Sequence, residues 1–336
     1  MFYFDHFRND LTSAEAAALF KKAIEIVEIS ISSYCNRRCS YCPNSIVDRL
    51  SQRRNMSDDL FMNILRNLCK IDYSGKISIH RYNEPLADRA YAMKRIREIR
   101  ALVPEAKIQI YTNGDYLDAS FVRELVESRV WRIMTTMHEA PNGTAYSDLL
   151  ENQVRFLNRI GLPVKGVSDL GAARWVQIET GAETEFLVCA QDFHRRDANG
   201  VVFMQDRGQS LPVERGMERT TPCFMPFDQL QIEWDGQMLP CCQIQPDAYE
   251  KDKYTLGRLT PTSDVFLEWT NANYVQWRKD LFSYEPKGAP CSTCSYGGFP
   301  ADTPETRARV AVWRKMLELD APAASPVAKV AEALFA

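Results

Sequence analysis

The sequence is poor in histidine, in long apolar runs and in net charge, and each shortage excludes a class of function. Four histidines in 336 residues leave little material for an acid–base mechanism built on several imidazoles. No apolar run approaches the roughly 18 residues of a membrane span. The net charge of −3 gives no electrostatic basis for binding nucleic acid or an anionic membrane. We therefore expect neither nucleic acid nor membrane among the partners.

Two further absences concern location and cofactor class. Residues 1–8 lack a basic segment followed by an apolar one, so we expect no signal peptide and a cytoplasmic protein. No Gly-x-Gly-x-x-Gly motif follows the first predicted strand, so a nicotinamide-binding Rossmann fold lacks its fingerprint. Ten cysteines in a chain without an export signal favour metal ligation over a disulfide framework.

The first half of the chain alternates between short apolar strands and helices. A length of 336 residues allows one large α/β domain and a smaller one. The alternation predicts a parallel sheet with helices outside it, whereas the polar region 168–220 predicts loops and short strands. The predicted strands are 24–31, 76–80, 107–111 and 131–137, with weaker candidates at 164–167 and 186–189. The predicted helices are 12–22, 57–68, 87–102, 118–128 and 146–160.

The pattern changes after residue 220. Residues 229–234 and 237–241 are predicted strands of a β-hairpin that turns at Asp235-Gly236. An aromatic helix is predicted over 266–281, and a further helix over 303–319. The tail after this helix, from Ala321, is rich in alanine and proline and is predicted to be peripheral.

Three thiols stand within eight residues, at Cys35, Cys39 and Cys42. A [4Fe-4S] cluster has four irons and is usually held by four thiolates, so three close thiolates predict a cube with one iron open to another ligand. The spacing differs from the paired knuckles of zinc fingers. The loop follows the first predicted strand directly, at the end of the strand where α/β proteins hold their chemistry.

A second set of thiols comes from three distant segments. Cys223 precedes the predicted hairpin, Cys241 closes it, and Cys291 and Cys294 follow some fifty residues later. Four soft thiolates can hold zinc or a second [4Fe-4S] cluster, and the residues alone leave both open.

Three cysteines remain. Cys69 falls in a predicted helix and is expected to be a small buried apolar group. Cys189 ends a weak predicted strand, where it would lie on the functional rim. Cys242 neighbours a predicted ligand, and it is a core residue, an alternative ligand or a thiol that faces the active site.

The spacing of the first three thiols, with Tyr41 before and Pro43 after Cys42, resembles the radical S-adenosylmethionine (SAM) enzymes. In that family the open iron chelates the amino and carboxylate groups of SAM. The second set, with its hairpin and final Cys291-x-x-Cys294 pair, resembles the twitch, a short form of the SPASM domain. This resemblance implies one auxiliary [4Fe-4S] cluster on all four thiols of that set.

The resemblance also implies a fold. It is an α/β protein with a partial (β/α)6 TIM-like barrel and a small C-terminal iron–sulfur twitch domain. The expected organisation is an N-terminal extension and helix over 1–22, the barrel over 23–215, the twitch domain over 216–300, and a C-terminal helix and tail over 301–336.

The SAM contacts of the family can be placed by the motifs. Tyr82-Asn83-Glu84-Pro85 takes the place of a Gly-Gly-Glu-Pro motif that binds the SAM amino group. Two glycines are replaced here, so Glu84 is the firmest member. The resemblance further implies that Tyr41 flanks the adenine. Four residues at the ends of the third and fourth predicted strands would lie near the ribose and carboxylate: Asn113, Gly114, Thr136 and His138.

Several runs, among them Asn83-Glu-Pro-Leu86 and Ile110-Tyr-Thr-Asn-Gly-Asp115, are similar to aminocyclitol dehydrogenases of aminoglycoside pathways in this family. This implies that a SAM-derived radical abstracts a carbinol hydrogen from an aminocyclitol or amino sugar. The auxiliary cluster would take the second electron and leave a ketone. Asp206-Arg207-Gly208 resembles a family segment whose arginine faces the substrate, and a flavodoxin- or ferredoxin-type donor would supply electrons.

Rival functions use the same residues differently. An epimerase would invert the same carbon, with Cys189 or Cys242 returning a hydrogen atom to the opposite face. Modification of a ribosomal peptide is a third reading, because the accessory domain occurs there too. A non-enzymatic iron–sulfur or zinc module would not need the open-site spacing of the first three thiols.

Overall fold

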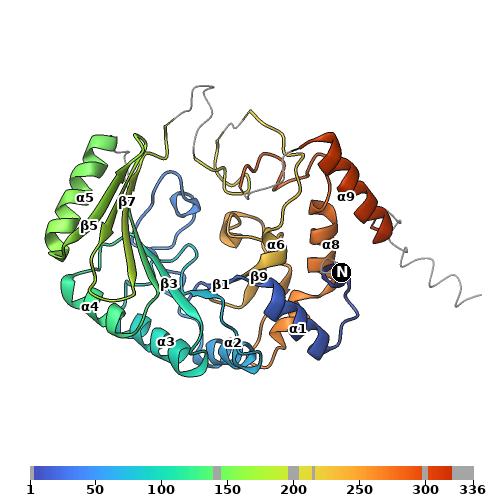
Figure 1. Cartoon of the computed structure of the whole chain (residues 1–336), viewed down its shortest axis with the longest axis horizontal. Helices are drawn as coiled ribbons and strands as arrows, with labels where there is room; N and C mark the ends of the chain where they lie inside the picture. Colours follow the sequence, from blue (N-terminus) through green and yellow to red (C-terminus); the bar gives the residue numbers. More distant parts are fainter. Residues whose placement is uncertain (1–3, 139–144, 196–203, 214–215, 297–301, 320–336) are drawn as a thin grey trace, which may run out of the picture.

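The computed structural model describes residues 4–138, 145–195, 204–213, 216–296 and 302–319 (Figure 1). The predicted tail from Ala321 lies outside these residues. The strands form one curved sheet in the order β10-β9-β8-β1-β2-β3-β4-β7-β6-β5. Helices α2 to α5 follow the outer side of the sheet, while α8 and α9 lie beyond the end that β8, β9 and β10 form. Within the described residues, no helix is both long and apolar enough to cross a bilayer.

The helices and strands have the following bounds. The strands are β1 (Ile26–Ile29), β2 (Lys76–Ser78), β3 (Lys107–Thr112), β4 (Arg132–Met137), β5 (Val164–Asp169), β6 (Ala173–Ile178), β7 (Glu185–Gln191), β8 (Gln229–Ile232), β9 (Gln237–Leu239) and β10 (Gly257–Arg258). The α-helices are α1 (Ser13–Ala23), α2 (Asp58–Lys70), α3 (Arg89–Leu102), α4 (Ala119–Glu127), α5 (Tyr146–Ile160), α6 (Met225–Asp228), α7 (Val265–Trp269), α8 (Ala272–Leu281) and α9 (Pro304–Met316). The short 3-10 helices are η1 (Phe4–Phe7), η2 (Pro43–Ser45) and η3 (Pro246–Ala248).

The predicted parallel sheet with outer helices is confirmed. Strands β8, β1, β2, β3, β4 and β7 are parallel neighbours. The weak strand predicted at 164–167 exists as β5, but it pairs antiparallel with β6 at the sheet edge. The place beside β4 is taken by β7, the other weak candidate, while β8 from the predicted hairpin adds a parallel strand beside β1. Most of β5 is exposed, which is usual for an antiparallel strand at the edge of a sheet, where at most one face is covered.

The core lies between the parallel strands and the outer helices. Val27, Ile77, Ile108 and Ile133 are fully buried on four neighbouring strands. Because side chains alternate along a strand, the residues next to them point into the barrel instead. Glu28 on β1 is one of these inward residues and is only partly buried. The alternation thus separates an apolar outer face from a polar interior.

Two local predictions are wrong. The single helix predicted over 266–281 is divided into α7 and α8, because Asn271 caps a new helix by accepting a bond from the Tyr274 N–H at 3.0 Å. The Thr270 hydroxyl donates back to the Phe266 carbonyl at 3.0 Å and helps to end α7. Cys69, predicted to be buried, is exposed because α2 turns this position away from its apolar face.

The predicted hairpin is confirmed, and its turn depends on a glycine. Strands β8 and β9 pair antiparallel on either side of Gly236, whose φ is 88°. A Cβ atom at this position would lie 2.3 Å from the Leu259 carbonyl oxygen. The Leu259 N–H donates to the Gly236 carbonyl at 2.8 Å, so the two backbones are held at this close approach.

We expect Gly236→Ala to lower the apparent free energy of unfolding by about 2 kcal/mol, because the side chain meets both a left-handed backbone and a fixed carbonyl. Anaerobic urea denaturation would measure the change. Gly166→Ala is the matched control, since a Cβ there meets no atom within 4 Å. Equal stability of the two variants would contradict the assignment.

Candidate active site

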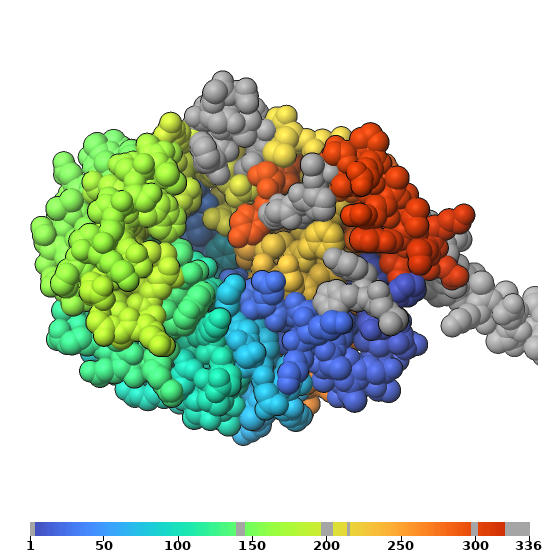
Figure 2. All heavy atoms as spheres, in the orientation of Figure 1, coloured from blue at the N-terminus to red at the C-terminus, as the bar shows by residue number. Residues whose placement is uncertain are grey.

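A cavity of about 470 Å³ opens at the carboxyl ends of the parallel strands. Small-molecule sites typically measure roughly 300–1,000 Å³. Figure 2 shows this face hollowed between the yellow-green strands and the yellow and orange C-terminal region. The predicted residues that line the cavity are Cys35, Cys39, Tyr41, Cys42, Tyr82, Asn83, Glu84, Asn113, Thr136, His138, Cys189, Arg207 and Cys242. The structure therefore gathers both halves of the predicted site, including the two spare thiols.

The loop of the first three thiols is clamped to the end of β3. Arg37 makes a bidentate ion pair with Asp115, at 2.8 Å through Nε and 2.6 Å through Nη2. Asn36 donates to the same carboxylate at 2.7 Å and accepts from the Asn113 amide at 2.7 Å. Bidentate arginine–carboxylate pairs fix orientation as well as distance. The thiol loop is thus oriented by the strand that carries a predicted SAM contact.

The chemistry of these thiols fits an iron cluster. Burial raises the pKa of Cys35 to about 12 and also raises the pKa of Cys42. The neighbouring thiols of Cys39 and Cys42 raise the pKa of Cys35 further. Iron would supply the positive charge that buried, mutually repelling thiolates need.

Glu84 is the most firmly held member of the predicted SAM motif. Its carboxylate accepts bonds from the Thr112 hydroxyl at 2.7 Å, the Asn113 N–H at 2.8 Å and the Leu86 N–H at 3.0 Å. Burial raises the pKa of Glu84 to about 7. A cation beside it would favour the carboxylate form, which suits a ligand that carries an ammonium group.

The two residues that replace motif glycines are used for packing as well as lining. The Asn83 side-chain oxygen accepts from the Ser30 hydroxyl at 3.2 Å and the Arg81 N–H at 3.0 Å. The Tyr82 hydroxyl donates to the Cys242 carbonyl at 2.9 Å. This last bond joins the SAM-motif loop to the segment of the second thiol set.

Tyr41 forms an aromatic wall. Its ring stacks on Phe193 with centroids 4.1 Å apart, and its hydroxyl is hydrogen-bonded to His138 Nδ1. Burial lowers the pKa of His138 to about 3, so the imidazole is neutral. An aromatic surface of this kind is suited to stacking on a purine ring.

Gly114 is a predicted SAM contact that does not line the cavity. Its φ is 78°, and a Cβ there would lie 2.6 Å from Thr135 Cγ2 and 2.9 Å from the Phe156 ring. The glycine is needed for the turn after β3 and for close packing beneath it. Asn113 next to it lines the cavity instead.

The second set of thiols also comes together. Cys223 is buried with Met225 and Leu281, and Cys241 and Cys291 pack against them. Burial raises the pKa of Cys291 to about 12, and the thiols of Cys223 and Cys294 raise it further. This donor set also needs a cation to become thiolate. Within the described residues, no group of three or more His, Cys, Asp or Glu side chains forms a site for a single metal ion.

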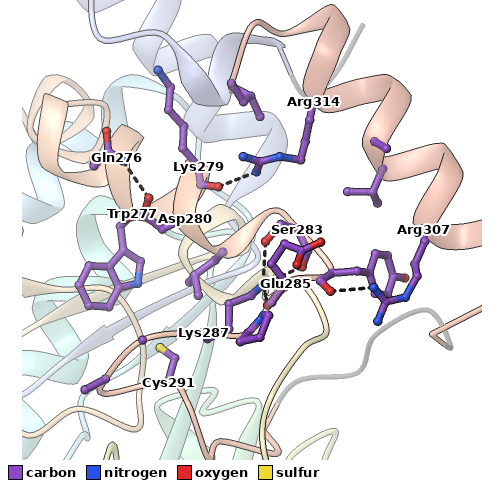
Figure 3. Close-up of a pocket in the computed structure, with 18 of the residues that line it drawn as sticks. Gln276, Trp277, Lys279, Asp280, Ser283, Glu285, Lys287, Cys291, Arg307 and Arg314 are labelled. Carbon is purple, nitrogen blue, oxygen red and sulfur yellow. Dashed lines mark hydrogen bonds between the residues drawn. The ribbon is translucent and has the colours of Figure 1, made fainter. Parts of the chain in front are cut away.

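A larger cavity of about 830 Å³ lies over Cys291, between α8, α9 and the loop after α8 (Figure 3). Its cations are held by the backbone: Lys287 donates to the Ser283 carbonyl at 2.7 Å, and Arg314 donates to the Lys279 carbonyl at 3.0 Å. None of the predicted SAM residues lines it. We therefore place the radical chemistry in the smaller cavity.

Arg207 is held in an unusual backbone conformation. Its φ is 49°, in the left-handed region, and the Tyr249 hydroxyl donates to the Arg207 and Gly208 carbonyls at 2.8 and 2.7 Å. Its guanidinium donates to Gln243 at 3.3 Å, and its Nε is buried without a hydrogen-bond partner among the described residues. Strained residues of this kind occur preferentially at functional sites.

Both spare thiols reach the cavity. Cys189 lies on β7 opposite Thr136 of β4, and Cys242 lies on the far wall beside Arg207. Burial raises the pKa of each thiol to about 12, so both carry hydrogen at neutral pH. The structure brings both candidates together and does not choose between them.

Sequence reasoning missed several polar and aromatic residues of the cavity. Glu28 could have been found, because a charge at an inward position of an otherwise apolar strand signals a polar interior. The others lie at strand ends or in loops without a distinctive pattern. The missed residues include Glu28, His80, Arg81, Tyr111, Trp175, Phe193 and Tyr296.

The Arg81 guanidinium connects the two halves of the site. It forms a fully buried ion pair with Glu233 at 2.6 Å and donates to Gln231 at 3.0 Å. It also donates to the carbonyls of Cys241 at 3.3 Å and Ile244 at 2.9 Å. The loop after β2 is therefore bound to the hairpin that carries the second thiol set.

The fold is a parallel barrel with three thiols after its first strand and four more thiols on segments around a hairpin. This combination defines a radical SAM enzyme with an accessory iron–sulfur domain. The chain belongs to the radical SAM superfamily, whose family model matches residues 29–161. A model for SPASM, an iron–sulfur cluster-binding domain, matches residues 223–295. The cofactors are accordingly SAM and iron–sulfur clusters.

The chain is similar to one dehydrogenase in sequence and to BtrN in structure. The chain is 32% identical over 277 residues to the S-adenosyl-L-methionine-dependent 2-deoxy-scyllo-inosamine dehydrogenase of Niallia circulans, covering 82% of this chain and 94% of the relative. It shares its fold with BtrN in complex with AdoMet and 2-DOIA, with a TM-score of 0.53, 22% identity and coverage of 77% and 87% of the two chains. An open form of BtrN matches with a TM-score of 0.51, 20% identity and coverage of 81% and 92%.

We expect Glu84→Gln to weaken SAM binding on the order of 100-fold, because an amide cannot accept all three chain donors and leaves a buried group unpaired. Equilibrium dialysis of SAM against the reconstituted protein would measure it. Glu105→Gln, at an exposed position before β3, should bind SAM normally. Unchanged affinity in Glu84→Gln would contradict this placement.

Proposed function

We propose that the protein oxidises a secondary alcohol of an aminocyclitol or amino sugar to a ketone. The curated relative is a dehydrogenase of this kind, which supports the reaction class. The observation that carries the proposal is the direct bonding of the SAM-motif loop to the second thiol segment, through Arg81 and Tyr82. A site for removing the second electron beside the site for hydrogen abstraction is what a net oxidation requires.

The proposed ligands follow the two thiol sets. Cys35, Cys39 and Cys42 would hold the cluster that binds SAM. The auxiliary [4Fe-4S] cluster would be held by Cys223, Cys241, Cys291 and Cys294. When bound, SAM and these clusters supply hydrogen abstraction from carbon and an acceptor for the second electron.

The chain's own residues position the substrate and SAM. Glu84, Asn113 and Thr136 would bind SAM, with Tyr41 against its adenine. The Arg207 guanidinium, which lines the cavity, would face a substrate hydroxyl, and its positive charge would favour loss of the hydroxyl proton as the ketone forms. Hydrogen leaves the carbon, one further electron leaves for the acceptor, and the hydroxyl proton is released.

A second candidate is epimerisation at the same carbon. The observation in its favour is that Cys189 and Cys242 both line the cavity as protonated thiols. A thiol on the far side of the ring from SAM could return a hydrogen atom with inversion. In either case we propose a flavodoxin- or ferredoxin-type electron donor and a cytoplasmic location.

Turnover in deuterated water separates these reactions. Under anaerobic conditions with 2-deoxy-scyllo-inosamine, we expect a ketone without carbon-bound deuterium, because no exchangeable thiol hydrogen returns to carbon. Mass spectrometry and NMR of the product would show this. An inverted alcohol that carries carbon-bound deuterium would contradict oxidation. Loss of that deuterium in Cys189→Ala or Cys242→Ala would identify the cysteine that donates the hydrogen atom.

Iron analysis tests the two-cluster assignment. The reconstituted protein should hold roughly eight irons and eight sulfides per chain, as two cubes require. The double variant Cys291→Ala and Cys294→Ala should fall to about four irons. Cys69→Ser is the matched control, because this exposed thiol should not affect iron content. About four irons with one zinc in the wild type would contradict an auxiliary cube.

A further inference from the structure

We propose that the carboxylate of Glu28 is the subsite for the ammonium group of the substrate. The inference rests on the proposed function, since it names the group by which an aminocyclitol is recognised at that same site. It also goes beyond that function, because it assigns a specificity-determining role to a residue of β1, the strand before the thiol loop.

The backbone places Glu28 at the floor of the cavity. It pairs in register with Ser78 of β2 and Gln231 of β8, so parallel strands flank it on both sides. Val27 and Ile29 on either side are fully buried in the core, so Glu28 points the other way, into the cavity that it lines. This residue therefore faces a bound molecule from below.

The charge of Glu28 has no ion-pair partner within the described part of the chain. The basic group whose charge acts on Glu28 is Arg81, and its guanidinium is already paired with Glu233 at 2.6 Å. Arg49 is also paired, because its guanidinium lies 3.5 Å from the Glu233 carboxylate and 2.8 Å from the Asp247 carboxylate. A carboxylate that is partly removed from water without an ion-pair partner is costly, and a bound ammonium would offset that cost.

The other carboxylate that lines the cavity is not available for this role. Glu84 already accepts three bonds, from Thr112, Asn113 and Leu86. It also lies in the motif that matches the SAM-binding position. Glu28 is thus the carboxylate left for a second cationic ligand.

The surroundings of Glu28 suit a polyol that carries an amine. Burial raises the pKa of Glu28, while the Arg81 charge and a hydrogen bond from Gln231 lower it. Burial raises the pKa of Tyr111, the Cys242 thiol and burial raise the pKa of Tyr296, and the Glu28 charge raises both further, so these hydroxyls lie within the electrostatic reach of Glu28. Neutral hydroxyls beside one carboxylate can bind ring hydroxyls on either side of an ammonium group.

The test compares an amine with its amine-free counterpart. Calorimetric titration of 2-deoxy-scyllo-inosamine into the SAM-loaded, reconstituted enzyme should show binding on the order of 100-fold tighter than the analogue with a hydroxyl in place of the amine. In Glu28→Gln this preference should fall to a few-fold, while Glu28→Asp should retain part of it. Glu25→Gln, exposed just before β1, is the matched control and should behave as wild type.

Iron content and SAM affinity of each variant would show that a lost preference is not a folding defect. A wild-type enzyme that binds the amine no better than its analogue would overturn the inference, and this comparison needs no variant. A full preference retained in Glu28→Gln would also overturn it, while leaving the dehydrogenase proposal intact. Epimerisation in place of oxidation would overturn the proposed function alone, because the binding comparison does not depend on the reaction.

Discussion

The buried guanidinium of Arg81 is the interaction on which the rest of the site depends. Arg81 lies after β2 and directly before the SAM motif. Its guanidinium reaches Glu233 and the Cys241 carbonyl in the C-terminal half. Removing it would leave Glu233 as a buried charge with only the 3.5 Å contact to Arg49, a loss that typically costs about 3–5 kcal/mol. Two segments separated by some 150 residues in the chain are therefore held as one rigid unit.

The titratable groups of the site fall into two kinds, the thiols of the two cysteine sets and the charged side chains of the cavity. Buried thiols at both cysteine sets have raised pKa values, so the protein alone keeps them protonated and depends on bound iron for their ionisation. Charged side chains elsewhere in the cavity are either paired or turned toward it. Arg37 is paired with Asp115, while Arg207 and Glu28 line the cavity and are free to meet a ligand of mixed charge.

The sequence was sufficient for features encoded locally. Strand 76–80, the cap at Ser57 and the turn at Gly236 depend on neighbouring residues, and the structure places each within a few positions of the prediction. Features that depend on distant pairing were not predictable. The place of β8 beside β1 and the antiparallel edge formed by β5 follow from strand pairing, which single-sequence periodicity does not encode. The inward position of Glu28 could be read from the alternation along β1, whereas its neighbours on β2 and β8 follow only from the strand pairing.

The adjacency of Cys241 and Cys242 has a consequence for electron flow. Both cysteines pack against the buried Cys223, Met225 and Leu281, and Cys242 also lines the cavity, so the cavity wall and the second thiol set share this segment. Consecutive Cα atoms lie about 3.8 Å apart across a trans peptide, so the backbone keeps a residue that lines the cavity next to a proposed cluster ligand. A molecule in the cavity and a cluster on the second thiol set would thus be joined through one short covalent segment, whose length the surrounding loops do not set.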